Sequence, residues 1–241
     1  MSKTTFSYAV LIFIIFQFLF FSCKPDNNKS GTNEKLKSEE IFNESIQGKK
    51  ETVPEAKEVK LSPNEQKKLN VFFSNFSEVG LKTFKKGEIT TEELINFGVY
   101  HNYRNNHKLF DSLGEGKLRL RDEYVVKSVQ KFFGITLKEH KQFQDIRYKP
   151  GYYYIFESDG EAFTFSQVEK VIDIGKNQFI AYVNVYTANS GWTGDEQANS
   201  KEWEKDGDGK PEFSGKYKAT YNKNVNSDGE VSYTLIEYIK K

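Results

Sequence analysis

Residues 150–156, with the sequence PGYYYIF, mark the point at which the hydrophobic pattern of the chain changes. Before this stretch, apolar residues recur every three or four positions, which is typical of helices that bury one face. From Tyr152 onward the pattern alternates, and aromatic and β-branched residues dominate, which is typical of strands. Helices followed by strands predict an α+β fold with an antiparallel sheet.

The second half of the chain predicts about five strands. They are expected over residues 152–156, 163–174, 179–187, 215–224 and 231–239. Tight turns at Gly175-Lys176-Asn177 and at Asp228-Gly229 would join neighbouring strands. We expect one curved antiparallel sheet, cone-like or cystatin-like, with the N-terminal helices packed on one of its faces.

The first half of the chain predicts three helices. Ser62 and Glu65 have the spacing of a capping box, in which each side chain bonds to the backbone of the other residue, and Thr90 and Glu93 repeat it. A third apolar stripe ends at Gly134, a residue type that commonly terminates helices.

The N-terminus has the features of an export signal. Residues 6–21 are almost wholly apolar, and Cys23, the only cysteine, follows directly after Ser22. This arrangement resembles the lipobox of bacterial lipoproteins, although Phe20 and Phe21 stand where the lipobox prefers Leu and a small residue. The resemblance implies that residues 1–22 are removed and that Cys23 carries diacylglycerol and palmitate. The alternatives are an uncleaved anchor helix and a plain secretory signal.

Residues 24–60 are polar and contain eight Lys and eight Asp or Glu. Such a segment cannot bury enough apolar surface to offset its ordering entropy. We therefore expect residues 23–60 to be a lipidated cysteine followed by a disordered tether, and residues 61–241 to be the folded domain. An Asp directly after the lipidated cysteine would resemble an inner-membrane retention signal. This chain has Lys24 at that position, which favours the outer membrane.

Four phrases of the domain strengthen the lipoprotein assignment. They are FSNFSE (73–78), HNYRNN (101–106), GYYY (151–154) and GEAFTFSQV (160–168). Together they resemble a family of bacterial lipoproteins that have a lipobox, a polar tether and one α+β domain. The family has no assigned activity, so the resemblance implies location and architecture and no chemistry.

Composition and motifs exclude several kinds of site. The 35 basic and 34 acidic residues leave a net charge of +1, which argues against a nucleic-acid partner. A single cysteine excludes a disulfide framework. His101 and His107 do not have zinc-ligand spacing, and with His140 we interpret them as polar surface residues, although His101 continues the apolar stripe of the second helix. We assign no catalytic residue, cofactor or metal.

The candidate ligand-binding residues come from three segments. They are Trp192, Trp203, His101, Asn105, Tyr152 and Tyr154. The two Trp belong to residues 188–214, a long stretch without a regular pattern, and they could bind a ligand or anchor this loop. His101 and Asn105 belong to a polar run that could line a pocket or bond to a helix end. The two Tyr share a strand face that could contact a ligand or be partly buried.

These observations predict a lipid-anchored protein of the bacterial cell envelope whose domain binds a protein or saccharide ligand without catalysis. The alternative is an envelope hydrolase or another enzyme with a site in the sheet cavity, near His101 and Glu161. A purely structural lipoprotein is a third possibility.

Overall fold

The computed structural model of the chain describes residues 56–158, 162–203 and 209–241. The expected signal peptide, Cys23, most of the expected tether and Glu161 lie outside the described residues. Within these ranges, no helix has the length and apolar character needed to cross a membrane. The described part contains three α-helices and two antiparallel sheets, which confirms the α+β class.

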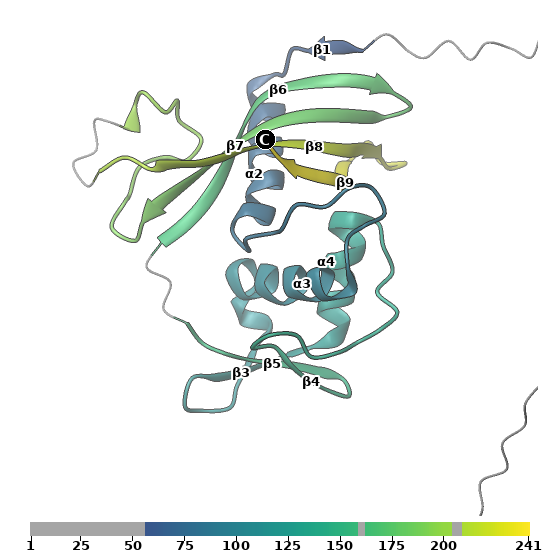
Figure 1. Cartoon of the computed structure of the whole chain (residues 1–241), viewed down its shortest axis with the longest axis vertical. Coiled ribbons are helices and arrows are strands. Elements are labelled where there is room, and N and C mark those ends of the chain that lie inside the picture. The colour runs from purple at the N-terminus through teal and green to yellow at the C-terminus, as the bar shows by residue number, and fades with distance from the viewer. Residues whose placement is uncertain (1–55, 159–161, 204–208) are drawn as a thin grey trace, which may run out of the picture. The chain divides into compact units, whose positions relative to one another are not determined.

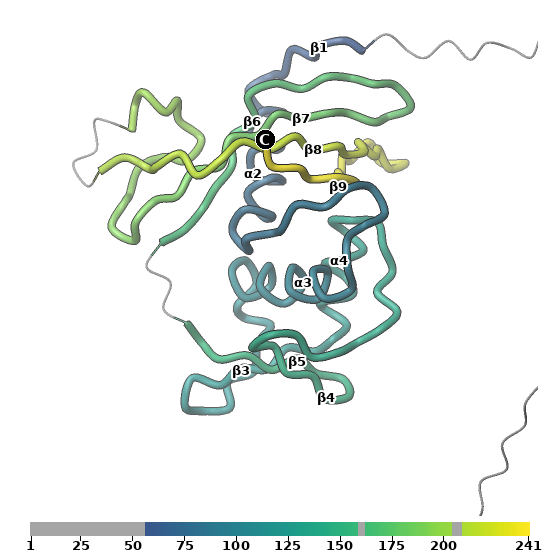
Figure 2. The backbone as a smooth tube through the Cα atoms, in the orientation of Figure 1, coloured from purple at the N-terminus to yellow at the C-terminus, as the bar shows by residue number. Residues whose placement is uncertain are grey.

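The larger sheet has five strands in the order β1-β6-β7-β8-β9, and all neighbours are antiparallel. Its strands are β1 (Lys57–Val59), β6 (Ala162–Gly175), β7 (Gln178–Asn189), β8 (Glu212–Val225) and β9 (Val231–Lys240). The turn between β6 and β7 places Lys176 and Asn177 at positive φ, as a tight hairpin requires. Figure 2 follows the chain through this hairpin.

The smaller sheet has four short strands in the order β2-β3-β5-β4. They are β2 (Asp111–Ser112), β3 (Lys117–Arg121), β4 (Arg147–Lys149) and β5 (Tyr152–Phe156). In Figure 1 this sheet lies at the opposite end of the described domain from β1.

The three helices begin where the sequence predicts, and α4 also ends at the predicted residue. They are α2 (Pro63–Ser77), α3 (Thr91–Asn105) and α4 (Asp122–Phe133), and a short 3₁₀ turn, η1 (His107–Leu109), follows α3. Both capping boxes form, and Gly134 ends α4 in the left-handed conformation at φ 67°. Local signals therefore set the starts of α2 and α3 and the end of α4.

Helices α3 and α4 form a layer between the two sheets (Figure 1). Helix α4 contacts β9 of the larger sheet and β3 of the smaller one, and α3 packs on α4. The helices approach closely because Gly98 has no side chain: a Cβ atom there would lie 2.6 Å from Cγ1 of Val125. Aromatic side chains fill the core where the helices meet, namely Phe72, Phe73, Phe76, Phe97, Phe132 and Phe133.

Helix α2 covers, with a polar stripe, the part of β6 that β1 leaves unpaired. The backbone N–H of Val168 donates to Oδ1 of Asn70 at 2.8 Å, and that of Ser166 donates to Oγ of Ser74 at 2.9 Å. The Ser166 hydroxyl donates to Oγ of Ser77 at 3.1 Å. These buried side chains replace a neighbouring strand, so the edge is closed to pairing with another chain.

The arrangement of the strands differs from the expected single sheet. Strands β6–β9 occupy one sheet as expected, but β5 belongs to the second sheet, whose other strands the sequence did not predict. Residues 57–59, at the end of the polar segment, form the edge strand β1. Strands β2, β3 and β4 escaped prediction because they are short and carry Lys, Arg and Asp, which strands generally disfavour.

Candidate functional site

The two tryptophans form a small buried cluster on the larger sheet. Trp192 is 6% exposed and Trp203 is 2% exposed, and both pack on Phe165 of β6. Because the neighbouring Ser166 faces α2, Phe165 points to the opposite face of the sheet. The indole N–H of Trp203 donates to the carbonyl of Asp195 at 3.0 Å. This burial agrees with the interpretation that the two Trp anchor the loop. It leaves little indole surface for a ligand.

His101 and Asn105 lie together near the end of α3. His101 is buried, 6% exposed, and stacks on Phe97 with ring centroids 5.4 Å apart, so the expected surface position is wrong for this residue. Burial, with a smaller effect of the Lys131 charge, lowers the pKa of His101 to about 4. Asn105 is exposed, and its amide donates to Oε2 of Glu78 at 3.1 Å. The pair links α3 to the chain segment after α2.

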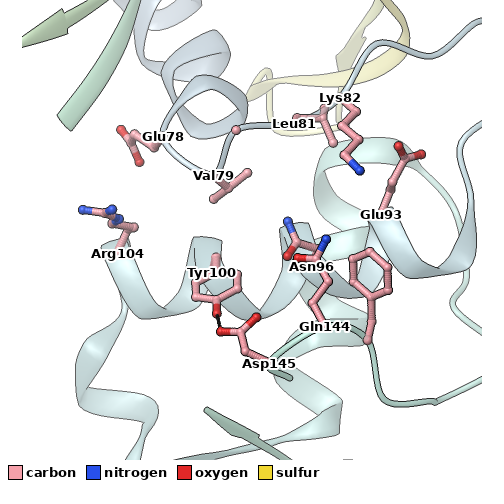
Figure 3. A pocket seen from close by; sticks show the side chains of 12 residues that line it. Glu78, Val79, Leu81, Lys82, Glu93, Asn96, Tyr100, Arg104, Gln144 and Asp145 are labelled. Carbon is pink, nitrogen blue, oxygen red and sulfur yellow. Dashed lines mark hydrogen bonds between the residues drawn. The ribbon is translucent and has the colours of Figure 1, made fainter. Parts of the chain in front are cut away.

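A polar cleft of about 380 Å³ opens beside these residues (Figure 3). One side of α3 supplies Glu93, Asn96, Tyr100 and Arg104, which follow each other at helical spacing. The segment 78–82 and the segment 143–145 form the other walls. The cleft therefore uses a different face of α3 from the one that buries His101.

The cleft combines carboxylates with cations. The Tyr100 hydroxyl donates to Oδ2 of Asp145, and burial, followed by this hydrogen bond, raises the pKa of Tyr100. Burial also raises the pKa of Glu78, while the hydrogen bond from Asn105 and the charge of Arg104 oppose this rise. In the described residues, no cluster of three or more His, Cys, Asp or Glu could hold a metal ion. The groups present can bind a small polar molecule or transfer a proton.

The outer face of the smaller sheet presents aromatic and cationic side chains to solvent. Strand alternation turns Leu118, Leu120, Tyr153 and Ile155 inward, where each is at most 3% exposed. The opposite side of the same strands carries the residues that we name the cationic face. It consists of Lys117, Arg119 and Arg121 on β3, Tyr152, Tyr154 and Phe156 on β5, and Arg147 and Lys149 on β4.

Strand register places the aromatic residues between two rows of cations. Tyr152 pairs with Arg121 on one side and Lys149 on the other. Tyr154 lies between Arg119 and Arg147 in the same way. The guanidinium carbon of Arg119 lies 4.7 Å from the centroid of the Tyr152 ring, a cation–π distance.

The charge of this face is largely uncompensated. Its cations are Lys117, Arg119, Arg121, Arg147 and Lys149, five in all. Within the described residues only Arg119 has a carboxylate partner, Asp111, at 2.9 Å. Phe156 is 65% exposed, an unusual position for a phenyl ring. The other cations contact neutral groups: Lys117 and Lys149 each lie 5.7 Å from the centroid of the Tyr154 ring, and Arg147 donates to the carbonyl of Gln144 at 3.2 Å. These side chains lie at the surface, where a ligand can reach them.

The structure therefore separates the six sequence candidates into three places. It brings Tyr152 and Tyr154 together on the cationic face, His101 and Asn105 together beside the cleft, and the two Trp together in the loop cluster. Sequence reasoning missed the cations of β3 and β4. The available signal was the strict alternation in KLRLR, residues 117–121, which turns every charge to one side.

Comparison with protein-family models, with curated proteins and with solved structures finds no match for this chain. Function is therefore inferred from the side chains of the cleft and of the cationic face, together with the features of the N-terminal sequence.

Proposed function

We propose that this chain is a lipid-anchored protein of the bacterial cell envelope whose domain binds a ligand without catalysing a reaction. The apolar run before Cys23 and its resemblance to a lipobox support the anchor. Each buried methylene of an acyl chain contributes about 0.8 kcal/mol, so two or three chains on Cys23 would hold the protein stably on the bilayer. The outer membrane is the proposed location, because Lys24 follows the cysteine.

The observation that carries the binding role is the position of Tyr152 and Tyr154 between rows of cations on an open face. Tyr and Arg are enriched in recognition surfaces, since they combine large contact area with hydrogen-bonding groups. The proposed ligand is a protein or a saccharide. A cone-like or cystatin-like curvature of the larger sheet belongs to this proposal and is supported by its β-bulges, where the strands bend.

The anchor is tested by growing cells that express the chain with labelled palmitate. The label should enter the wild-type protein and be absent from Cys23→Ala. Ser22→Ala is the matched control and should keep the label, because alanine is also a small residue. Incorporation that survives in Cys23→Ala would contradict the proposal.

The binding role is tested by cosedimentation of the full chain with purified cell-wall sacculi and, separately, with envelope proteins. Replacing Tyr152 and Tyr154 by Ala should abolish retention on the ligand-bearing fraction. Tyr182→Ala removes a tyrosine from the larger sheet and should leave retention unchanged. Equal retention of all three proteins would argue against the face as a binding surface.

The alternative, an envelope hydrolase or another enzyme, is supported by the cleft. A carboxyl group with a raised pKa, such as Glu78, can act as a general acid, and the hydrogen-bonded pair Tyr100 and Asp145 lines the same cleft. His101 makes its described hydrogen-bonding contact to Asn105 and not to a carboxylate. Release of soluble reducing sugars from sacculi by the wild-type chain, lost in Glu78→Gln, would favour the enzyme.

A further inference from the structure

We propose that the cationic face selects an anionic glycan, a saccharide chain that carries carboxylate or phosphate groups. This inference deepens the proposed function and rests on it. The ligand class follows from one observation: a row of aromatic rings on β5 lies between a row of cations on β3 and another on β4.

A local excess of positive charge favours an anionic ligand. The whole chain has a net charge of +1, whereas the cationic face has five cations, of which only Arg119 pairs with a carboxylate within the described residues. Lys117, Arg121, Arg147 and Lys149 are exposed, and none has a carboxylate partner among the described residues. Clustered like charges repel one another, and an anionic ligand removes that repulsion. Guanidinium groups also bind carboxylate and phosphate oxygens in a bidentate manner.

The row of aromatic rings on β5 has a shape that suits a linear glycan. Alternate residues along a strand lie about 7 Å apart, so Tyr152, Tyr154 and Phe156 form a linear series of rings along β5. Neighbouring strands lie about 4.8 Å away, which places a cation row beside the rings on each side. In the structure, Arg119 lies over the Tyr152 ring and Lys117 and Lys149 lie over the Tyr154 ring. When these cations turn to the charged substituents of a glycan, the aromatic faces offer flat apolar area to the C–H faces of its sugar rings. A linear anionic glycan that follows β5 would use both sets of groups.

The position of the cationic face favours a polymer as its ligand. The bilayer in which the anchor would be inserted is the less favoured ligand. The described chain begins at residue 56, next to β1. In Figures 1 and 2, β1 and the smaller sheet lie at opposite ends of the described domain. A tether that enters at β1 would leave the cationic face at the end of the domain away from the point of attachment. The proposed envelope location also favours a glycan over nucleic acid.

The test measures binding of the full chain, reconstituted in vesicles of zwitterionic phosphatidylcholine, to fluorescent polygalacturonate. Dextran, a neutral glucan, serves as the uncharged probe. Binding to polygalacturonate should be saturable and should weaken as salt screens the charges, whereas dextran should bind at least about tenfold more weakly. Equal affinity for the two glycans would overturn charge selection.

Charge reversal locates the site. Arg121→Glu with Lys149→Glu changes the two cations beside Tyr152 and should weaken polygalacturonate binding by about tenfold or more, because charged hydrogen bonds are lost. Lys85→Glu with Lys86→Glu makes the same change in charge on an exposed loop and should shift affinity by less than about twofold. A similar loss in both double variants would show non-specific attraction and overturn the proposal.

Two further probes test the competing ligand classes. Tighter binding of oligothymidylate, or of vesicles that contain phosphatidylglycerol, than of polygalacturonate would overturn the glycan assignment.

Failure of the glycan proposal can be distinguished from failure of the proposed function. If the wild-type protein takes up no palmitate label, the anchor is refuted whatever the glycan result. If labelling and tyrosine-dependent retention are both observed but charge selection fails, only the ligand class is refuted.

Discussion

Two tyrosines, one on each sheet, have opposite environments. Tyr238, on β9 of the larger sheet, is 1% exposed and stacks on Tyr217 with ring centroids 4.4 Å apart. Tyr152, on β5 of the smaller sheet, is only half-buried and lies beside Arg119. Strand alternation and the layer that a face meets, and not the residue type, decide whether an aromatic side chain builds the core or the surface.

Charged residues differ between the sheets in the same way. On the larger sheet, Lys216 pairs with Glu169, and Lys223 pairs with Glu65 of α2. On the cationic face, Arg119 alone has a carboxylate partner within the described residues. Balanced charges keep a surface soluble, whereas a local excess of one sign attracts a ligand of the other sign. The smaller sheet is therefore the one on which we propose that the ligand binds.

The largest expected effect separates the two tyrosines. Tyr238→Ala should lower the free energy of unfolding by about 3–5 kcal/mol, because it leaves a cavity in the core. Tyr152→Ala should cost less than about 1 kcal/mol, since its ring faces solvent in part. Urea denaturation of the full chain measures both. Equal losses would show that the two sheets do not differ in the way described.

A pH effect tests the helix layer between the sheets. Unfolded His101 takes up a proton near its ordinary pKa of 6.5, whereas the folded residue resists protonation until about pH 4. The stability that depends on neutral His101 is therefore complete above about pH 6.5 and is lost as the pH falls toward 4, by about 2–3 kcal/mol. His101→Phe should show a smaller loss between pH 7 and pH 4. Identical pH profiles would contradict the buried position.

The sheet edges offer a third contrast, because α2 protects the larger sheet whereas charged residues occupy the edge strand β4 of the smaller one. Asn70→Ala removes the acceptor of the Val168 N–H and should cost about 1–3 kcal/mol. The Val168 amide should then exchange its hydrogen faster. Asn64→Ala, at an exposed position of the same helix, is the control. An unchanged exchange rate in Asn70→Ala would show that water or another group can satisfy this edge.

The smallest effect concerns the stability cost of the cationic face. Lys149→Gln removes one of several mutually repelling charges and should raise the free energy of unfolding by about 0.5 kcal/mol at low salt. Replacement of residues at functional sites commonly stabilises a protein in this way. Lys85→Gln should change it by less. The gain should disappear at high salt, where repulsion is screened. A loss of stability in Lys149→Gln at low salt would mean that Lys149 supports the fold.

The sequence predicts the local features of this fold well and its long-range pairing poorly. Helix boundaries follow from Ser62, Thr90 and Gly134, because caps act over a few residues. Strands β6–β9 follow from long alternating segments. The pairing of β5 with β3 could not be predicted, since Arg121 and Tyr152 meet only when α4 brings distant segments together. Short charged strands give no independent signal.

The candidate sites show the same division. The alternation of residues 152–156 places Tyr152 and Tyr154 on one face, but their cationic neighbours come from other strands. The helical spacing of His101 with Phe97 indicated burial, and its polar character outweighed that signal in our prediction. Trp203 fits equally well in a binding loop and in a buried cluster, so composition alone could not decide its role.

The most direct measurement compares charge reversal on the two sheets, with fluorescent polygalacturonate as the probe and the full chain in phosphatidylcholine vesicles. Arg121→Glu with Lys149→Glu should weaken binding by about tenfold or more. Lys216→Glu with Lys218→Glu, the same change on the larger sheet, should leave affinity within about twofold of wild type. Equal losses in the two variants, or a loss confined to the larger sheet, would contradict the assignment of binding to the cationic face.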